Sequence, residues 1–524
     1  MKSTIAALVV FGVMSAIHAD PLWVRSYNGP NSTYDEIHAI GVDDSGNVVV
    51  SGFSSLSEYD EEFVTIKYRP DGDTAWLRHF DPGSGLDGAT ALAVDRSGNV
   101  IVTGFLGSSS SEYGDWVTIE YSPSGESLWA SVYDQGDEDR PSSIVVDSAG
   151  NSYVTGRAGS LNYFDFTVVK YGPAGDQVWV FSYDGSENDG GNAVAVDNRG
   201  NTYATGYTNR GGDGPDLMTW KLGVGGESLW ANVYDGPAGR ADYGSVIAVD
   251  PAGNVVVAGS SADTSGLGNY ITIKYGPTGE TLWTRRYTGP TSMQDNVKGL
   301  ALDPGGNVYV TGTTSLDGAH FNYATVKYAP DGTERWAVRY TGPRNQDASC
   351  GIALDSAGNV YVSGSSVNAE ARWDFATVKY DPDGNQRWLE RYDRPSTWDE
   401  AYVLAVSRQG HVYVAGRTGI ENNGIDYQTL CYGAAGAVAE GRSAPCGVCS
   451  TTGRTIVRGV LFLPKSTRAS SSWLLDASGR KVLELAPGAN DVRHLSPGVY
   501  LVRTEYSRAQ GVRGAKVGRV VIAR

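Results

Sequence analysis

Eight aspartates recur at one place in the sequence and are the side chains best suited to bind a cation or a polar ligand. Each stands eight residues before the end of the first expected strand of a repeat, at Asp35, Asp87, Asp139, Asp189, Asp242, Asp295, Asp347 and Asp399. Carboxylate oxygens bind hard cations such as calcium, and they accept hydrogen bonds from sugar hydroxyls. A short acidic side chain can instead cap its own loop by accepting backbone N–H bonds. Because every copy has this aspartate, we favour the loop cap over the binding ring.

A second polar register precedes the third expected strand of each repeat, and a basic register lies within that strand. The polar register comprises Glu62, Asp115, Asp165, Asp216, Asn269, Asn322, Asp374 and Asp426. Because asparagine replaces aspartate there, we expect hydrogen-bonding geometry to matter more than charge. The basic register comprises Lys67, Lys170, Lys221, Lys274, Lys327 and Lys379, with Glu120 and Cys431 in two copies. Two environments stay open for these lysines: pairing with the aspartate ring, or solvation.

Motifs of well-known enzyme classes do not occur in the sequence. Five histidines follow residue 19 and none stands in H-E-x-x-H, and neither a G-x-S-x-G elbow nor a Walker loop is found. Aromatic residues in variable loops could stack on sugar rings or pack against neighbouring loops, namely Tyr59, Tyr113, Tyr163, Tyr243, Trp373 and Trp398. The sequence therefore predicts a binding protein and no catalytic residues.

Two markers show that these registers belong to one long repeat. Glycine followed by asparagine recurs every 50 to 53 residues, at Gly46, Gly98, Gly150, Gly200, Gly253, Gly306 and Gly358, with Gly410-His411 as an imperfect eighth copy. A tryptophan keeps the same period, at Trp23, Trp76, Trp129, Trp179, Trp230, Trp283, Trp336 and Trp388. A fixed period of this length is typical of propellers and solenoids.

Each period holds four short runs of alternating apolar residues separated by turn residues, which is the pattern of β-strands. In the sixth copy the runs are Gly299–Asp303, Asn307–Gly312, Tyr323–Tyr328 and Arg335–Tyr340. Eight units of four strands predict an all-β, eight-bladed β-propeller over residues 20–433. The last copy ends after its third strand, while Leu22–Tyr27 stands alone near the N-terminus. We therefore expect this N-terminal strand to complete the last blade and close the ring.

The repeat pattern V-D-x-x-G-N-x-Y-V-T-G, followed by D-F-A-T-V-K-Y-x-P-D-G-x-x-x-W, resembles the bacterial β-propeller repeat family labelled SBBP. The resemblance covers residues 22–432. It implies extracytoplasmic display or binding. Members of this family are often described as seven-bladed, so seven blades remain the alternative to eight.

The two ends of the chain predict export. Residues 1–19 have a basic start, an apolar run and Ala19 before the expected cut, which are the marks of a signal peptide. Residues 434–454 are rich in Ala, Gly and Ser and predict a linker, and residues 455–524 predict a small β-sandwich. The stretches Leu474–Val482 and Leu495–Arg503 resemble C-terminal sorting domains of type IX secretion. This resemblance implies contact with the secretion machinery, then release or attachment at the outer-membrane surface.

Charge and cysteine content narrow the possible partners. A net charge of -17 disfavours nucleic acid, because sequence-independent affinity for phosphates comes from Lys and Arg. Four cysteines in 524 residues do not form a disulfide framework, and the C-x-x-C of Cys446 and Cys449 supplies too few ligands for a structural zinc. We expect a secreted or surface-displayed monomer that binds a glycan or a protein and needs no cofactor beyond a cation such as calcium at the aspartate ring. The alternative is an extracellular polysaccharide lyase or glycoside hydrolase that uses carboxylates on the same loop face.

Overall fold

The computed structural model describes residues 21–433 except 32–33, 58–59, 82–84, 109–110, 137, 161–162, 186, 212–213, 290–293, 395–396 and 421–423, and beyond them 455–457, 460–463, 469–475, 480–485, 488–491, 498–507 and 513–522. Contacts divide the chain into two units, Met1–Ala437 and Val438–Arg524. The predicted signal peptide and the predicted linker lie outside the described residues. Within the described ranges the secondary structure is all β, and no helix there could cross a membrane.

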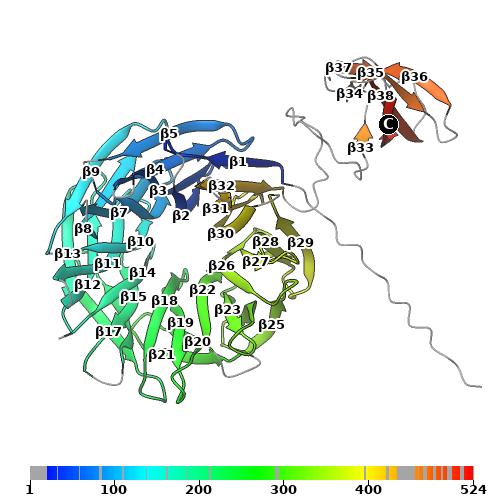
Figure 1. Cartoon of the computed structure of the whole chain (residues 1–524). Helices are drawn as coiled ribbons and strands as arrows, with labels where there is room; N and C mark the ends of the chain where they lie inside the picture. The colour runs from blue at the N-terminus through cyan, green and yellow to red at the C-terminus, as the bar shows by residue number, and fades with distance from the viewer. Residues whose placement is uncertain are drawn as a thin grey trace, which may run out of the picture. The chain divides into compact units, whose positions relative to one another are not determined.

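The first unit is an eight-bladed β-propeller, in which four-stranded antiparallel sheets surround a central channel (Figure 1). The innermost strands, called a, are β2 (Asp35–Val42), β6 (Gly88–Val94), β10 (Arg140–Val146), β14 (Gly190–Val196), β18 (Asp242–Val249), β22 (Asp295–Leu302), β26 (Asp347–Leu354) and β30 (Thr397–Val406). The b strands are β3 (Val48–Ser57), β7 (Val100–Ser108), β11 (Ser152–Ser160), β15 (Thr202–Thr208), β19 (Val255–Ala262), β23 (Val308–Ser315), β27 (Val360–Val367) and β31 (Val412–Ile420).

The two outer strands of each blade follow in the same order. The c strands are β4 (Asp60–Tyr68), β8 (Ser111–Tyr121), β12 (Tyr163–Tyr171), β16 (Asp216–Leu222), β20 (Gly268–Tyr275), β24 (Phe321–Tyr328), β28 (Trp373–Tyr380) and β32 (Ile425–Tyr432). The d strands are β5 (Thr74–Phe80), β9 (Ser127–Tyr133), β13 (Gln177–Tyr183), β17 (Ser228–Tyr234), β21 (Thr281–Tyr287), β25 (Glu334–Tyr340), β29 (Gln386–Tyr392) and β1 (Trp23–Tyr27). Eight blades are present, so the seven-bladed alternative is wrong.

The a–b hairpins explain the Gly-Asn marker of the repeat. In blade 1, Gly46 has φ +83°, a left-handed conformation that glycine adopts without strain. Asp43 Oδ1 accepts the backbone N–H of Asn47 at 2.9 Å, and Asp43 Oδ2 accepts the Asn47 side-chain amide at 2.7 Å. The D-x-x-G-N signature is therefore a hairpin whose aspartate and asparagine bind each other.

The innermost strands begin earlier than the apolar pattern predicts. In blade 6 the first run was expected to start at Gly299, but β22 starts at Asp295 and is interrupted by a bulge between Val297 and Gly299. A bulge breaks the strict alternation of side chains, which hides the first residues of the strand from a period-two search. The same irregularity occurs in every a strand, and in blade 1 it lies between Ile37 and Ala39.

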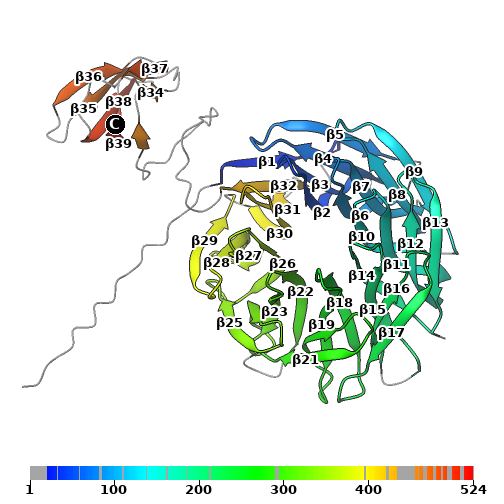
Figure 2. The same ribbon diagram turned by 180° about the vertical axis from the view of Figure 1, so that it is seen from behind.

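The blade that closes the ring contains both ends of the propeller segment. Strand β1 lies beside β32 and pairs with it antiparallel (Figure 2). In this register Trp23 lies opposite Cys431. Trp23 packs in a core cluster that joins Tyr413 of blade 8 to Tyr68 of blade 1. Packing between the faces of neighbouring sheets forms the core throughout the ring, with aromatic side chains in each interface.

The described residues of the second unit form two small sheets. A five-stranded sheet has the order β33 (Thr455–Val457), β39 (Arg513–Ile522), β38 (Gly498–Ser507), β35 (Ala469–Leu475) and β36 (Lys481–Leu485). A two-stranded sheet joins β34 (Val460–Leu463) to β37 (Gly488–Asp491). Of the two sorting-domain stretches, residues 476–479 and 495–497 lie outside the described residues.

Candidate ligand-binding face of the propeller

The eight ring aspartates stand where each chain segment enters its innermost strand, and all eight accept backbone hydrogen bonds. Donors in the d–a loops include Gly29 to Asp35 at 2.8 Å and Gly342 to Asp347 at 2.7 Å. Other donors lie at the ends of b strands, such as Gly107 to Asp87 at 2.9 Å. Asp139, Asp189 and Asp295 accept from both places. These are the hydrogen bonds of a loop cap.

Burial separates the ring aspartates from the channel. Each of the eight residues is at most 2% exposed. Burial raises the pKa of Asp87 to about 7, and the negative charges of Asp81 and Asp60 add to this effect. Burial likewise raises the pKa of Asp139 to about 6. The carboxyls serve the loops that cover them, and binding of a cation by the ring stays a prediction.

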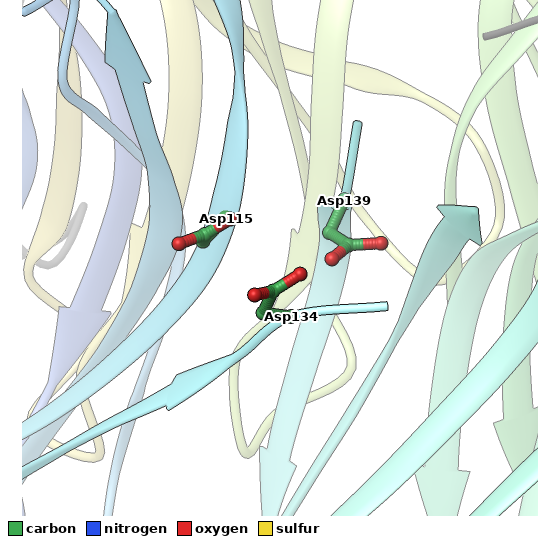
Figure 3. A group of neighbouring side chains, drawn as sticks. All are labelled: Asp115, Asp134 and Asp139. Atoms are coloured by element: carbon green, nitrogen blue, oxygen red, sulfur yellow. The ribbon is translucent and has the colours of Figure 1, made fainter. Parts of the chain in front are cut away.

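Two groups of three aspartates form where the polar register meets the ring. In one, Asp134 lies between Asp115 and Asp139 (Figure 3), and one carboxylate oxygen of each lies within 4.8 Å of the others. The second group is Asp216, Asp235 and Asp242. Three carboxylates at this spacing could chelate a divalent cation. Backbone N–H groups already bind part of the first group, because Asp139 accepts from Gln135 and Gly159.

The partner of the polar register changes from blade to blade. Strand d offers Arg391 to Asp374 at 2.8 Å, His79 to Glu62 at 2.7 Å and Ser182 to Asp165 at 3.2 Å. The equivalent strand-d residues beside the two aspartate groups are Val132 and Val233. The acidic groups therefore arise where strand d supplies an apolar residue in place of a hydrogen-bond donor.

The lysines of strand c do not pair with the ring aspartates. Lys67 Nζ lies 2.9 Å from Asp43 Oδ2, in the a–b hairpin at the opposite end of the blade. Lys274 contacts Asp250 in the same way at 3.4 Å, and Lys170 lies over the Tyr153 ring at 5.0 Å. All six are buried. Both sequence-based alternatives were wrong, because the lysine lies near the hairpin end of strand c, far along the blade from the ring.

Next to each invariant aspartate lie positions that vary from blade to blade. The residue after the aspartate in strand a lies opposite one residue of strand b, and the eight pairs are Glu36–Phe53, Gly88–Phe105, Arg140–Arg157, Gly190–Tyr207, Tyr243–Ser260, Asn296–Thr313, Ala348–Ser365 and Glu400–Arg417. These positions lie on the innermost two strands at the loop end of the channel. A rigid scaffold that presents variable side chains is the usual arrangement of a binding face.

One of these groups, which we call the Arg417 cluster, joins blade 8 to blade 1. It comprises Tyr34, Glu36, His38, Trp398, Glu400, Tyr402 and Arg417. Arg417 contacts Glu36 at 2.7 Å across the blade boundary and Glu400 at 2.6 Å within its own blade. The guanidinium also lies 5.0 Å from the Trp398 ring centroid and 5.3 Å from that of Tyr402. One cation thus holds two carboxylates and the surrounding aromatic rings in place.

Hydrogen bonds fix the ionisation of the cluster. Tyr34 donates to Glu36 at 2.5 Å, and Tyr402 donates to Glu400 at 2.7 Å. Burial opposes ionisation of Glu36, but hydrogen bonds from His38 and Tyr34 and the charge of Arg417 outweigh it and lower its pKa. Burial and the hydrogen bond to Glu400 raise the pKa of Tyr402. At neutral pH Glu36 is therefore an acceptor and Tyr402 a donor.

The sequence-based analysis identified one member of this cluster, Trp398, among the loop aromatics. It missed the other six because it searched for residues that recur, whereas these occur in one seam. A register comparison restricted to the position after each ring aspartate would have detected Glu36 and Glu400. Of the other predicted aromatics, Tyr243 stacks edge-on against Tyr207 at 5.6 Å and Tyr163 is 68% exposed. Tyr59 lies outside the described residues.

Comparison with known families finds one family that matches the repeat. Residues 134–164, 282–318 and 335–368 match the family described as SBBP, beta-propeller repeat. These three segments of the chain match the SBBP repeat. The SBBP part of the sequence-based resemblance is thereby confirmed, and the matched segments fall in repeats that the structure folds as propeller blades.

Individual proteins are similar to this chain at low identity. The uncharacterized WD repeat-containing protein L264 of Acanthamoeba polyphaga mimivirus is 24% identical over 453 residues, covering 71% of this chain and 32%, or about a third, of that protein. Sqt1 from Chaetomium thermophilum has a TM-score of 0.53 at 11% identity, covering 80% of this chain and 100% of its own. A polysaccharide lyase, an ulvan lyase, has a TM-score of 0.44 at 11% identity, covering 78% and 96%. The likeness to Sqt1 shows the propeller fold alone.

Proposed function

We propose that this SBBP propeller is an extracellular binding scaffold that binds a glycan at the loop end of its channel without cleaving it. The observation that carries the proposal is the Arg417 cluster, which breaks the eightfold repetition of the scaffold. A residue that the blade itself requires recurs in every blade, as the ring aspartates do. The seven polar and aromatic residues of the cluster are partly exposed and occur in one seam only, so the blade itself does not require them. Binding of a ligand would explain why they are there.

The chemistry of the cluster suits a sugar. A pyranose ring presents C–H groups on its faces and hydroxyls around its edge. Trp398 and Tyr402 offer partly exposed aromatic surface for the faces, and the ionised Glu36 accepts hydrogen bonds from the hydroxyls. His38, with 32% of its side chain exposed, adds a further polar group on the innermost strand of blade 1.

A lyase or a glycoside hydrolase is the second candidate, since Glu36, Glu400 and His38 are acids and bases confined to one seam. Glycoside cleavage by two carboxyl groups needs one of them protonated, with a raised pKa. The pKa of Glu36 is lowered instead, and Arg417 holds both carboxylates in ion pairs. This arrangement favours binding over cleavage.

An array of plant, algal and bacterial polysaccharides tests the proposal. The native protein, Trp398→Ala and Trp373→Ala are compared, because Trp373 is a partly buried tryptophan that begins strand c on the same face but lies outside the cluster. We expect Trp398→Ala to lose at least tenfold in affinity and Trp373→Ala to match the native protein. Release of reducing ends or of unsaturated uronates from any array member would favour the enzyme instead, and equal binding by both variants would refute the site.

We also propose that the chain is exported as a monomer, with residues 455–524 contacting the secretion machinery and the mature protein released or held at the outer-membrane surface. The signal-peptide pattern of residues 1–19 and the resemblance of residues 474–482 and 495–503 to type IX sorting domains support this route. Deletion of residues 455–524 is expected to leave the propeller inside the cell envelope. Secretion of the truncated chain at the native level would refute the proposal.

A further inference from the structure

A pocket formed by residues of the two innermost strands of its blades lies apart from the Arg417 cluster. This pocket has a volume of about 350 Å³ and is lined by blades 2, 3 and 4, through Thr90, Arg140, Pro141, Ser142, Arg157, Gly190, Gly191, Asn192 and Tyr207. The lining residues come from the innermost strands β6, β10 and β14 and from the b strands β11 and β15. The volume lies within the range of small-molecule sites.

Two arginines dominate the pocket. Arg140 and Arg157 lie opposite each other on β10 and β11, so their side chains leave the same part of the sheet. Glu138 Oε1 contacts Arg157 Nη2 at 2.5 Å and Arg140 Nε at 3.3 Å. Glu138 is 2% exposed, whereas 38% of the Arg157 side chain and 23% of the Arg140 side chain are exposed. Of these three side chains, the anion is buried and the two cations are partly exposed.

Aromatic rings hold both guanidinium groups in place. Arg140 lies over the Phe105 ring at 4.2 Å, and Arg157 lies over the Phe164 ring at 4.8 Å. A guanidinium fixed on one face presents its N–H groups in its own plane, which is the geometry that matches the two oxygens of a carboxylate or a sulfate. A preorganised pair loses little conformational entropy on binding.

The pair is confined to blade 3. At the equivalent positions the other blades carry one arginine at most, in Glu400–Arg417, or none, as in Gly190–Tyr207 and Ala348–Ser365. Gly190 keeps the adjacent wall open, because a Cβ atom there would lie 2.9 Å from the Tyr207 ring. The neighbouring Tyr207, Asn192 and Thr90 offer hydroxyl and amide groups around the two cations.

We propose that this pocket binds the anionic group, carboxylate or sulfate ester, of an acidic sugar. The sugar part of the inference rests on the proposed glycan-binding function, and the anion part rests on the arginine pair alone. The two sites would then contact different groups of the ligand. The Arg417 cluster would contact the ring faces and hydroxyls of the sugar, and the blade 3 pocket would contact its negatively charged groups.

Three matched probes test the inference by saturation-transfer NMR: D-galactose, D-galacturonate and D-galactose 6-sulfate. The native protein should give signals for one or both charged sugars and at most a weak signal for galactose. The Arg157→Gln variant should lose the charged-sugar signals, whereas Arg335→Gln, which removes the same charge at an exposed site in strand β25, should keep them. Glu138→Gln should tighten binding of the charged sugars, because it removes the competing carboxylate.

The outcomes separate this inference from the proposed function. Trp398→Ala should keep the charged-sugar signals, because Trp398 lies in the seam of blades 8 and 1. The inference is overturned if neither charged sugar binds, if galactose binds equally well, or if Arg157→Gln retains the preference for charge. A native array signal that depends on Trp398 would leave the proposed function standing in each of those cases. The relative strength of the galacturonate and sulfate signals identifies which anion the pocket prefers.

Discussion

Trp23 Nε1 donates a hydrogen bond to the Pro70 carbonyl at 2.9 Å, across the boundary between blade 8 and blade 1. The same contact joins other neighbouring blades, as from Trp76 to Pro123 at 3.0 Å and from Trp283 to Pro330 at 3.0 Å. Six of the eight strand-d tryptophans thus bind the c–d hairpin of the next blade, whereas Trp129 donates to Glu120 of its own blade. Blade 8 has no such hairpin, because its strands β32 and β1 come from opposite ends of the propeller segment. Trp388 therefore has no acceptor for its indole N–H among the described residues.

Trp23 and Trp388 provide a matched pair for measuring this hydrogen bond. Both indoles are buried, at 7% and 3% exposure. Trp23→Phe removes volume and the hydrogen bond, whereas Trp388→Phe removes similar volume and an unpaired donor. We expect Trp23→Phe to cost about 0.5–1.5 kcal/mol more in the free energy of unfolding, measured by urea denaturation. Equal losses would show that the bond to Pro70 contributes nothing to closure.

Asp87 should make stability depend on pH. Its folded pKa, about 7, exceeds the unfolded value, so the folded state binds more protons between about pH 4 and pH 7. The stabilising contribution is therefore present at low pH and is lost as pH rises through 7. Asp87→Asn should unfold at a higher temperature than the native protein at pH 8, with the gap closing towards pH 4.

Asp147 gives the control for that titration, because its shift has the opposite sign. Burial opposes ionisation of Asp147, but hydrogen bonds from Asn151 and Tyr153 outweigh it and lower its pKa. The native protein should be more stable than Asp147→Asn near neutral pH and should lose this advantage as pH falls below about 4. Parallel curves for the two variants would contradict the assignment of opposite environments.

Glu120 is expected to lower the stability of blade 2. Six of the other seven blades carry lysine at the equivalent position of strand c. Burial together with the charge of Asp95 raises the pKa of Glu120. Glu120→Lys should restore the hairpin ion pair and stabilise the protein by about 0.5–2 kcal/mol in thermal unfolding. Lys67→Glu is the reverse change in blade 1 and should cost about 3–5 kcal/mol, because it leaves Asp43 beside a second buried carboxylate. A destabilised Glu120→Lys variant would refute this account.

The ring aspartates should behave as caps whether or not metal is present. Asp295 accepts hydrogen bonds from Gly289, Thr314 and Ser315, and asparagine offers one acceptor oxygen in place of two. Asp295→Asn should therefore cost about 0.5–2 kcal/mol equally in calcium and in EDTA. A native melting temperature that rises with calcium, and a variant that no longer shows the rise, would establish the ring as a cation site.

The fold was largely predictable because its determinants recur. The hairpin glycine Gly46 and the strand-d Trp23 each occupy a fixed register, and self-similarity reveals such positions without an alignment. Strand starts were harder to place, since the bulge near Gly299 breaks the alternation on which they depend. The partner of Lys67 was missed for a geometric reason. Lys67 is separated from Asp35 and from Asp43 by similar distances along the sequence. Which of the two aspartates lies beside it depends on which end of strand c the lysine occupies in the folded blade.

The candidate sites were less predictable than the fold. Residues that recur in every blade, such as the ring aspartates, are the ones that the propeller fold requires. Arginine occurs at the register position of Arg417 and Arg157 only in these two blades. A search for residues that recur in every blade therefore does not detect them. Their meaning depends on cross-strand neighbours, Glu400 and Arg140, that the strand register supplies. A register-by-register comparison of the blades recovers these pairs from sequence once strand starts are known.

Hydrogen exchange of the native protein, with and without the polysaccharide that it binds most strongly on the array, tests the central claim most directly. Binding at the Arg417 cluster should slow amide exchange in β2, β30 and β31, around Glu36, Glu400 and Arg417. Amides in the a–b hairpins at the opposite end of the blades, such as Gly46, should be unaffected. Protection confined to the hairpin end, or spread equally over all eight blades, would contradict a ligand site built from the residues that break the repeat.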